Sequence, residues 1–326
     1  MILRKFAGYH RLMWMTKKDG FDLEKKRKHK KFGCLFICAL IFLFGCQERR
    51  KEPGVENSMR QNSVQESAEY DNSMQENPGV KVTFFDVGKG DAILIETREY
   101  TLLIDAGYDK TYGVIRDYLA KQEIEKLDYL VITHFDKDHV GGADRVVSEF
   151  EVGEILQPDY ASDGGQYQEY RAVLEEKKLQ PVLVTESMQF SLDGADFYIY
   201  PPQKKTYEEE DNDFSLTVSM AYGERSFLFA GDCEEERLDE LLLQTEFDLS
   251  HDVLKVPHHG KKEDNSREFL ERVAPEAAVI TCSSEEPASK KLCNMLDELG
   301  TQVYLTSDGT VTCLCDGKNL EMSVAP

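Results

Sequence analysis

A single polar segment, Thr133 to Gly142, constrains the fold of this chain more than any other stretch. It directly follows the apolar run Tyr129 to Ile132, and within six residues it holds four potential metal ligands: His134, Asp136, Asp138 and His139. Positions 134, 136 and 138 alternate, so in an extended loop their side chains can point the same way, while position 139 can reach a second ion from the other side. The segment therefore predicts a strand that ends in a loop binding two metal ions.

Taken alone, the same spacing is also typical of a solvated polar turn whose aspartates cap a helix. The rest of the chain favours the metal site. From residue 80 onward there are five histidines, and four of them lie in two short segments that follow apolar runs: His134, His139, His258 and His259. Asp232 also ends an apolar run, Phe229 to Gly231. These nitrogen and oxygen ligands suffice for two divalent ions, with Asp232 placed to bridge them.

The charge of the chain is strongly acidic and unevenly distributed. Its 326 residues carry a formal net charge of -22, and 41% of them are hydrophobic, enough for a sizeable core. Eleven of the 39 basic residues but only three of the 61 acidic residues lie in residues 1–46, which leaves 28 basic and 58 acidic residues in the remainder. A surface this acidic repels a phosphate backbone unless cations or a local basic patch intervene, which argues against tight binding of duplex nucleic acid.

The N-terminal region has the pattern of an export signal. A basic run, Lys25 to Lys31, precedes the apolar run Phe32 to Gly45, which at fourteen residues is too short for a comfortable membrane span. The segment ends Leu43-Phe44-Gly45-Cys46, which resembles the lipobox of bacterial lipoproteins. The resemblance implies that the mature chain is lipid-anchored through Cys46 on the extracytoplasmic face of a bacterial cell membrane. An uncleaved N-terminal anchor with the same outward topology is the alternative.

Residues 1–46 are thus predicted to be a signal and lipobox segment, and residues 47–79 a disordered linker, because that stretch has scarcely an aliphatic side chain. Residues 80–326 are predicted to form one folded domain. This domain holds an odd number of cysteines without a paired framework, so we predict no essential disulfide. Cys313 and Cys315 alternate on an expected strand and should both face the core.

The folded domain alternates apolar runs of strand length with runs of helical length. Strands are predicted at residues 81–88, 91–96, 100–107, 128–133, 152–157, 180–185, 216–222, 226–230, 252–257, 277–281 and 302–305, with hairpins at 190–200 and 310–324. Helices are predicted at residues 111–121, 142–150, 166–178, 234–244, 266–273 and 288–299, and residues 207–213 are expected to be an acidic connector. This alternation indicates a mixed α/β domain.

Four motifs occur in an order typical of one family: Leu103 to Gly107, the His-x-Asp-x-Asp-His-x-Gly-Gly loop from His134, Phe229 to Asp232, and Val256 to Gly260. Through them, residues 80–326 resemble the metallo-β-lactamase superfamily. Within it, the chain is most similar to the soluble hydrolase domain of ComEC-type DNA-uptake proteins, whose pattern includes two longer stretches, Phe84 to Ala92 and Val253 to Gly260. The resemblance implies an α/β (α+β) fold, a four-layer αββα sandwich.

The resemblance also implies which side chains bind two divalent ions. His134 and Asp136 would serve one ion and Asp138 and His139 the other, with Asp232 between them. Two such ions lower the pKa of a bridging water to about 7 and polarise a phosphoryl or carbonyl oxygen of the substrate.

Other residues would support this centre. Either His258 or His259 would complete the ligands of one ion, and the second of the pair, His259, would contact the substrate if it does not bind metal. Asp138 would also be catalytic, by positioning the metal-bound hydroxide. Asp105 would orient a ligand or the loop. Further candidates for substrate contacts are Asn212, which stands where other members have a metal-binding His, and two lysines that flank the second histidine pair, Lys255 and Lys261. A lysine beside a strand end is, however, more often solvated.

Three positions depart from the family pattern. Asp136 stands where the zinc-dependent lactamases have His, which makes the site richer in oxygen ligands and favours Mn²⁺ or mixed occupancy over Zn²⁺. Lys261 stands where ComEC-like chains usually have Ser, and Glu286-Pro287 stands where they often have a late His-Pro, a candidate proton donor or phosphate contact. No part of the chain resembles the multi-span channel of the DNA-uptake proteins.

These observations predict a lipid-anchored, extracytoplasmic metallohydrolase with two divalent ions, Zn²⁺ or Mn²⁺, that cleaves a phosphodiester. The substrate would be a nucleic acid strand or a small phosphodiester, and no feature identifies a protein partner. Two alternatives remain: a lactamase-like amide or ester hydrolase, which Asp136 disfavours, and a binding protein whose metal ions stabilise the fold without catalysis.

Overall fold

The computed structural model describes residues 79–208 and 210–325. The predicted signal and lipobox segment, and all of the predicted linker except Gly79, lie outside the described residues. Within the described ranges, no helix combines the length and apolar character needed to cross a membrane.

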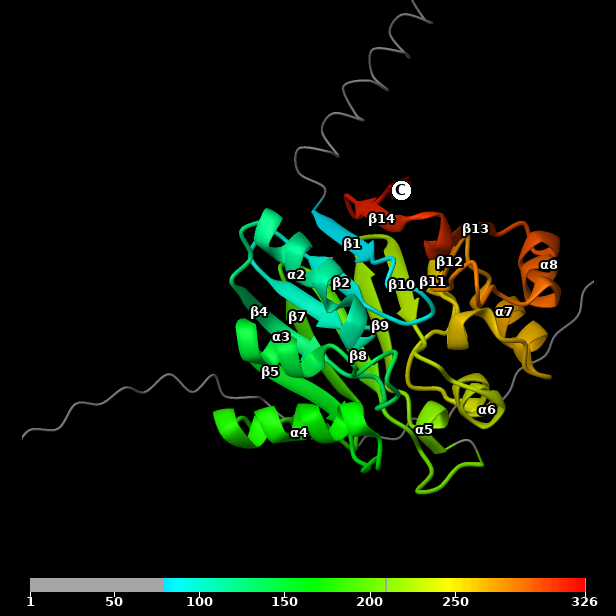
Figure 1. Ribbon diagram of the computed structural model, residues 1–326. Coiled ribbons are helices and arrows are strands. Elements are labelled where there is room, and N and C mark those ends of the chain that lie inside the picture. The colour runs from blue at the N-terminus through cyan, green and yellow to red at the C-terminus, as the bar shows by residue number, and fades with distance from the viewer. Residues whose placement is uncertain (1–78, 209, 326) are drawn as a thin grey trace, which may run out of the picture. The chain divides into compact units, whose positions relative to one another are not determined.

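Two mixed β-sheets face each other at the centre of the fold (Figure 1). Sheet A has eight strands in the spatial order β15 (Leu320–Ala325), β14 (Thr310–Cys315), β1 (Val80–Phe84), β2 (Ile93–Glu96), β3 (Thr101–Ile104), β4 (Lys126–Val131), β5 (Glu151–Pro158) and β6 (Val182–Val184). Sheet B has seven, in the order β13 (Gln302–Leu305), β12 (Ala277–Ile280), β11 (Val253–Lys255), β10 (Arg225–Phe229), β9 (Thr217–Tyr222), β8 (Ala195–Tyr200) and β7 (Met188–Leu192).

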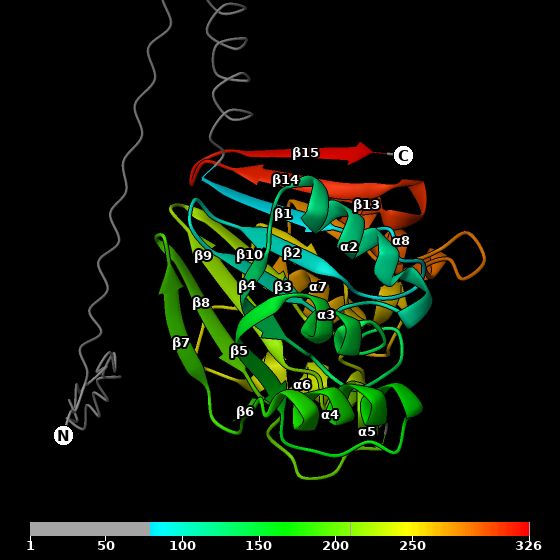
Figure 2. The same cartoon turned by 60° about the vertical axis from the view of Figure 1, so that its left-hand side comes forward.

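Helices cover the outer face of each sheet. On sheet A, as Figure 2 shows, these are α2 (Tyr112–Lys121), α3 (Ala143–Glu149) and α4 (Gly165–Lys177). On sheet B they are α6 (Glu235–Leu243), α7 (Ser266–Val273) and α8 (Lys290–Glu298). The remaining helical segments are short: α5 (Glu210–Asp213), η1 (Asp109–Thr111), η2 (Pro257–Gly260) and η3 (Thr306–Asp308).

Strand alternation explains why the sheets bury both faces. Phe227 and Phe229 of β10 point into the layer between the sheets, where they join Phe84 of β1. Leu228, between them in sequence, points the other way and packs with the helices of sheet B. A third apolar layer lies between sheet A and its helices. Three apolar layers separate four layers of secondary structure, so the predicted αββα sandwich is confirmed.

Strand direction brings the predicted site residues to one edge. In sheet A the neighbours β3, β4 and β5 are parallel, and in sheet B so are β10, β11 and β12. Ligands in such folds bind outside the carboxyl ends of parallel strands. The loops after β3, β4, β10 and β11 are those that carry Asp105, the polar segment, Asp232 and the second histidine pair.

Local differences from the sequence-based prediction are small. The first strand ends at Phe84 instead of Gly88, because the chain turns there and Phe85 N–H donates to Ala92 O at 3.0 Å. The expected acidic connector contains one helical turn, α5. Cys313 and Cys315 are completely buried between the sheets, as predicted, and the cysteines of the described residues are free thiols.

Candidate metal centre

The polar segment after β4 forms a tight turn instead of the extended loop that its alternation predicted. It buries His134, Asp138 and His139, while Lys137 stays exposed. Asp136 O accepts hydrogen bonds from the backbone N–H groups of His139 and Val140, each at 2.9 Å, which closes the turn. Two glycines let the loop pack against its neighbours: a Cβ on Gly141 would lie 2.2 Å from Lys137 O, and one on Gly142 would lie 2.5 Å from Ala106 O. The Gly-Gly pair is therefore a steric requirement of the loop.

His139 is held in one orientation by Asp105. The ring Nδ1 lies 2.8 Å from Asp105 Oδ2, and Thr133 donates to the same carboxyl group through its N–H at 2.7 Å and its hydroxyl at 2.6 Å. Because a carboxylate only accepts, Nδ1 carries the proton and Nε2 presents a lone pair. Asp105 itself has a φ of 57°, a conformation that costs energy for a residue with a side chain. This geometry fits the orienting role inferred for Asp105.

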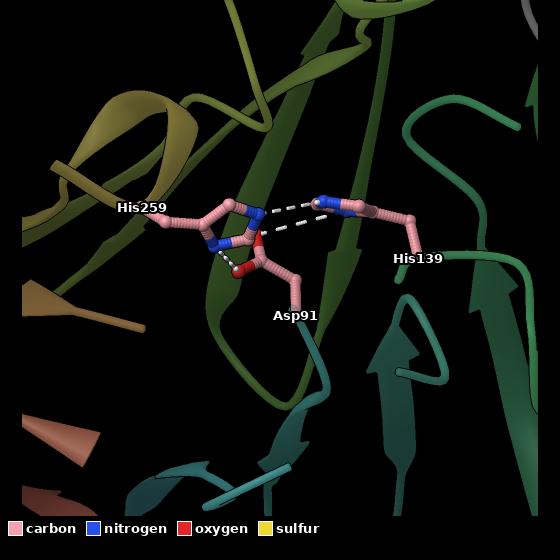
Figure 3. Close-up of side chains that lie close together, drawn as sticks. All are labelled: Asp91, His139 and His259. Carbon is pink, nitrogen blue, oxygen red and sulfur yellow. Dashed lines mark hydrogen bonds and ion pairs between the residues drawn. The ribbon is translucent and has the colours of Figure 1, made fainter. Parts of the chain in front are cut away.

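His259 is held in the same way from sheet B. Its Nδ1 lies 2.9 Å from the backbone oxygen of Thr281, which can only accept, so Nε2 again presents a lone pair. His259 Nε2 lies 3.3 Å from His139 Nε2, and Figure 3 shows the two rings facing each other with Asp91 beside them. Two imidazoles from different sheets therefore direct their metal-binding nitrogens at the same point.

Asp232 completes this meeting point. Its Oδ2 lies 3.0 Å from His259 Nε2 and 3.3 Å from His139 Nε2. Asp138 also faces it, with Oδ2 at 3.5 Å from His259 Nε2. When both rings are neutral, their protons are engaged elsewhere, and the groups that converge here are all acceptors. Such a set is stable only with a proton or a metal ion between its members, and four nitrogen and oxygen ligands are typical of a divalent metal site.

His134 provides a further reason to infer a metal. It is completely buried, and its Nε2 has no hydrogen-bond partner among the described residues. Its Nδ1 faces two hydroxyls, Thr133 Oγ1 at 3.1 Å and Ser215 Oγ at 3.3 Å. Burial, and after it the nearby His139, lowers the pKa of His134 well below its ordinary value. A neutral imidazole with an unpaired buried nitrogen is suited to bind a metal ion.

The electrostatics favour a cation at the meeting point. Burial by itself lowers the pKa of His139, but Asp232, Asp105 and Asp91 outweigh it and hold that pKa well above its usual range. The same carboxylates would attract a divalent ion. Asp136 differs: its side chain is 39% exposed, its Oδ2 lies 3.9 Å from His134 Nε2, and burial followed by repulsion from other acids raises its pKa to about 6.

The sequence-based reasoning assigned no role to Asp91, which the structure places in the centre. Asp91 Oδ1 accepts from Thr281 Oγ1 at 2.6 Å and lies 3.6 Å from His259 Nδ1. Asp91, His139 and His259 form one of the groups able to hold a cation. It precedes β2, which runs antiparallel to β3, so its position matches that of Asp105 after β3. The available signal was the Gly-Asp pair Gly90-Asp91, the same dipeptide as Gly231-Asp232, but placed before an apolar strand and not after one.

Lys255 does not lie where a substrate contact would. It is completely buried, and its ammonium group donates to Gly231 O at 2.8 Å and pairs with Asp91 Oδ2 at 2.6 Å and Asp232 Oδ1 at 3.2 Å. Asp91 and Asp232 are buried beside it, so Lys255 balances their charge. We therefore correct its interpretation from a substrate contact to a buried counter-ion of the centre.

His258, Asn212 and Lys261 gather around Glu234, away from the meeting point. Glu234 Oε1 lies 2.8 Å from His258 Nδ1, 2.9 Å from Asn212 Nδ2 and 2.8 Å from Lys261 Nζ. Burial by itself raises the pKa of Glu234, but His258 and Lys261 lower it to about 2. His258 Nε2 stays 4.0 Å from Asp232 Oδ2. Of the histidine pair, the geometry therefore favours His259 as the metal ligand.

Comparisons with known proteins find relatives of this chain by sequence. The sequence profile of the metallo-beta-lactamase superfamily matches residues 85–283. ComE operon protein 3 of Bacillus subtilis (strain 168) is 26% identical over 260 residues, which cover 71% of this chain and 32% of that protein. Competence protein ComA of Neisseria gonorrhoeae is 29% identical over 203 residues, which cover 61% of this chain and 26% of that protein. The chain thus spans less than a third of the length of these relatives.

A solved structure of similar fold is the metallo-beta-lactamase fold protein YhfI from Bacillus subtilis. It is 12% identical with a TM-score of 0.45, and the alignment covers 69% of this chain and 96% of that one. Likeness at this level is limited to the fold. The likeness to competence proteins that the motifs predicted is confirmed by the relatives named above.

Proposed function

Because the chain belongs to the metallo-beta-lactamase superfamily, whose members are mostly metal-dependent hydrolases, we propose that it is a binuclear metallohydrolase that cleaves a phosphodiester. The observation that carries this proposal is the convergence of three acceptors, His139 Nε2, His259 Nε2 and Asp232 Oδ2, within 3.3 Å of one another. His139 and His259 would hold one ion together with Asp138. His134 and Asp136 would hold the other, and Asp232 would contact both.

When bound, the two ions would lower the pKa of a water molecule and polarise the phosphoryl oxygen of the substrate. The chain's own residues prepare the site for this chemistry. Asp105 and the carbonyl of Thr281 hold the tautomers of His139 and His259 that leave Nε2 free. Asp138, at the rim of the centre and 8% exposed, would accept a hydrogen bond from the attacking water and fix its direction.

Three features support a phosphodiester over an amide. Oxygen ligands are more numerous here than in the zinc-dependent lactamases, since Asp136 replaces a histidine. Lysines line the cavity beside the centre, although the chain as a whole is acidic. One of the relatives, ComA of Neisseria gonorrhoeae, bears the name of a competence protein. An acidic protein of this kind suits a small phosphodiester or a single strand better than a duplex.

The activity can be tested on the full chain purified in mild detergent, stripped with EDTA and reloaded with Mn²⁺ or Zn²⁺. We expect turnover of bis-p-nitrophenyl phosphate, loss of turnover in Asp138→Asn, and no turnover of a chromogenic lactam. Hydrolysis of the lactam alone would replace the proposal with the amide hydrolase alternative. Tight metal binding without hydrolysis of either compound would instead favour the non-catalytic binding protein.

We also propose that the chain is attached to the extracytoplasmic face of a bacterial membrane by lipid on Cys46. This rests on the lipobox-like segment, Leu43 to Cys46, which lies outside the described residues. Metabolic labelling with a palmitate analogue should mark the wild type and not Cys46→Ser. Membrane attachment that persists unchanged in the unlabelled variant would point to the uncleaved anchor.

A further inference from the structure

A cavity of about 610 Å³ opens beside the second histidine pair, and its lining is basic. Besides His258 and His259, it is lined by five lysines and a single acid: Lys89, Lys261, Lys262, Lys290, Lys291 and Glu286. Acidic residues outnumber basic ones 61 to 39 in the whole chain, so this lining is opposite to the average composition. Its volume lies within the range of about 300–1,000 Å³ that is typical of small-molecule sites.

Among the residues that the structure describes, three of these lysines have no carboxylate partner. Lys261 lies 2.8 Å from Glu234 Oε1, and Lys262 lies 3.4 Å from Asp264 Oδ1. In the part of the chain that the structure describes, Lys89, Lys290 and Lys291 form no ion pair, and Lys290 and Lys291 are exposed. Like charges gathered without partners repel one another, so this arrangement is unfavourable unless an anion binds among them.

The position of Lys290 and Lys291 adds to the electrostatic repulsion. They are the first two residues of α8, and no acidic residue lies in its first turn. The N-terminal end of a helix carries a partial positive charge that favours anions and disfavours lysine. The helix itself therefore does not account for two lysines at this end, whereas an anionic ligand in the cavity does.

Lys89 is tied directly to the metal loop. Lys89 lies in the turn before Asp91, and this turn is fixed by the backbone N–H of Asp91, which donates to Asp138 O at 3.0 Å. A Cβ on the neighbouring Gly90 would lie 2.6 Å from the same oxygen, so the turn and the loop are in close contact. The lysine-lined cavity and the proposed metal centre thus share one wall.

We propose that this cavity binds a second phosphate group of the substrate, next to the phosphodiester that is cleaved at the metal centre. The inference rests on the proposed function and narrows its substrate class to phosphodiesters that carry a further phosphate. That phosphate is either a terminal monoester or the next linkage of a chain. Ammonium groups at the cavity wall supply the charge-assisted hydrogen bonds that a phosphate oxygen accepts.

The test compares substrates that differ by one phosphate, using the metal-loaded full chain. Thymidine 5′-(p-nitrophenyl phosphate) is hydrolysed side by side with its 3′-phosphorylated form, and with a form extended by a second nucleotide through a 3′-phosphodiester. We expect kcat/KM to be about tenfold higher for the substrates with the extra phosphate. This preference should decrease as salt is raised. The two extended forms distinguish a terminal phosphate from a chain linkage.

The variant pair is designed to separate cavity charge from total charge. Lys290→Gln with Lys291→Gln should bring the ratio of kcat/KM values close to one. The matched control, Lys121→Gln with Lys318→Gln, removes two exposed lysines outside the cavity lining and should leave the ratio as in the wild type. Equal hydrolysis of all three substrates by the wild type, or a ratio that survives in the cavity variant, would overturn the second-phosphate site and leave the hydrolase proposal intact.

If the wild type hydrolyses none of these compounds, the proposed function fails, and binding alone decides the inference. Isothermal titration with thymidine 3′,5′-bisphosphate and with thymidine 5′-monophosphate then replaces the rate measurements. Tighter binding of the bisphosphate that is lost in the cavity variant supports the site. Equal affinity for the two nucleotides refutes it.

Discussion

The two halves of the candidate metal centre are built in different ways. On sheet A, the loop after β4 is a tight turn in which Asp136 O accepts from the N–H groups of His139 and Val140, and it buries the adjacent Asp138 and His139 together. On sheet B, two neighbouring histidines follow β11 in consecutive left-handed conformations, with φ of 44° at His258 and 52° at His259. One of them enters the centre, while the other turns to Glu234.

The difference teaches when side-chain direction can be inferred from sequence. In an extended segment, the period of two fixes which side chains share a face, but the turn on sheet A breaks this period, since the adjacent Asp138 and His139 are both buried while Asp136 is 39% exposed. In a turn of consecutive left-handed residues there is no such period, and the conformation costs energy that the surroundings must offset. Here the carbonyl of Thr281 and the carboxylate of Glu234 select the two ring orientations, and both lie far away in sequence.

The largest effect is expected from the buried lysine on the sheet B side. Lys255→Met removes the counter-ion between Asp91 and Asp232 and should lower the free energy of unfolding by about 3–5 kcal/mol. Chemical denaturation of the EDTA-treated protein measures this. Because divalent ions can replace the lost charge, we expect the deficit to shrink in Mn²⁺ or Zn²⁺; an equal deficit with and without metal would show that the lysine acts through packing.

The second prediction tests whether His259 and not His258 binds the metal. His259→Ala should weaken metal binding by more than about 100-fold, the upper end of the range for residues that only orient a ligand. His258→Ala should weaken it by less than about tenfold. Metal content after dialysis against a graded chelator measures both, and the reverse order of the two variants would assign the ligand to His258.

On the sheet A side, Asp105 orients His139 as the carbonyl of Thr281 orients His259. Asp105→Asn leaves an acceptor for the Thr133 N–H but no longer enforces the tautomer of His139, and we expect metal affinity to fall about 10- to 100-fold. The same chelator titration measures this effect, and Asp128→Asn, on the strand β4 that leads to the loop, serves as the control. An unchanged affinity would limit Asp105 to a role in folding.

The smallest effect concerns the histidine that belongs to neither half. His251 is buried, with Nε2 at 2.7 Å from Ser219 Oγ, and burial lowers its pKa. As pH falls below about 6.5, the unfolded chain gains this proton before the folded one, so folding stability decreases, by at most about 1.4 kcal/mol per pH unit. We expect His251→Gln to show a smaller loss than the wild type between pH 7.5 and 5.5 without metal, as judged by denaturant midpoints.

Most of the fold could be predicted from the sequence, because the patterns that indicate helices and strands are local. Helix α7 and strand β13 begin and end where the apolar pattern predicts. His134 and Asp232 could also be predicted as site residues, because both stand at the ends of apolar runs. The role of Asp91 and the burial of Lys255 could not be predicted, since both depend on how β2 and β11 are placed against strands from other parts of the chain.

By itself, then, the sequence determined the family, the order of the strands and helices, and the loop that carries Asp138 and His139. The spacing of polar residues along the chain and the burial of apolar faces are properties of neighbouring residues. Only the tertiary structure decided that His259 faces the centre and that Lys255 lies beneath it. Those outcomes depend on hydrogen-bond and charge partners such as Thr281 and Asp91, which only the packing of the two sheets brings together.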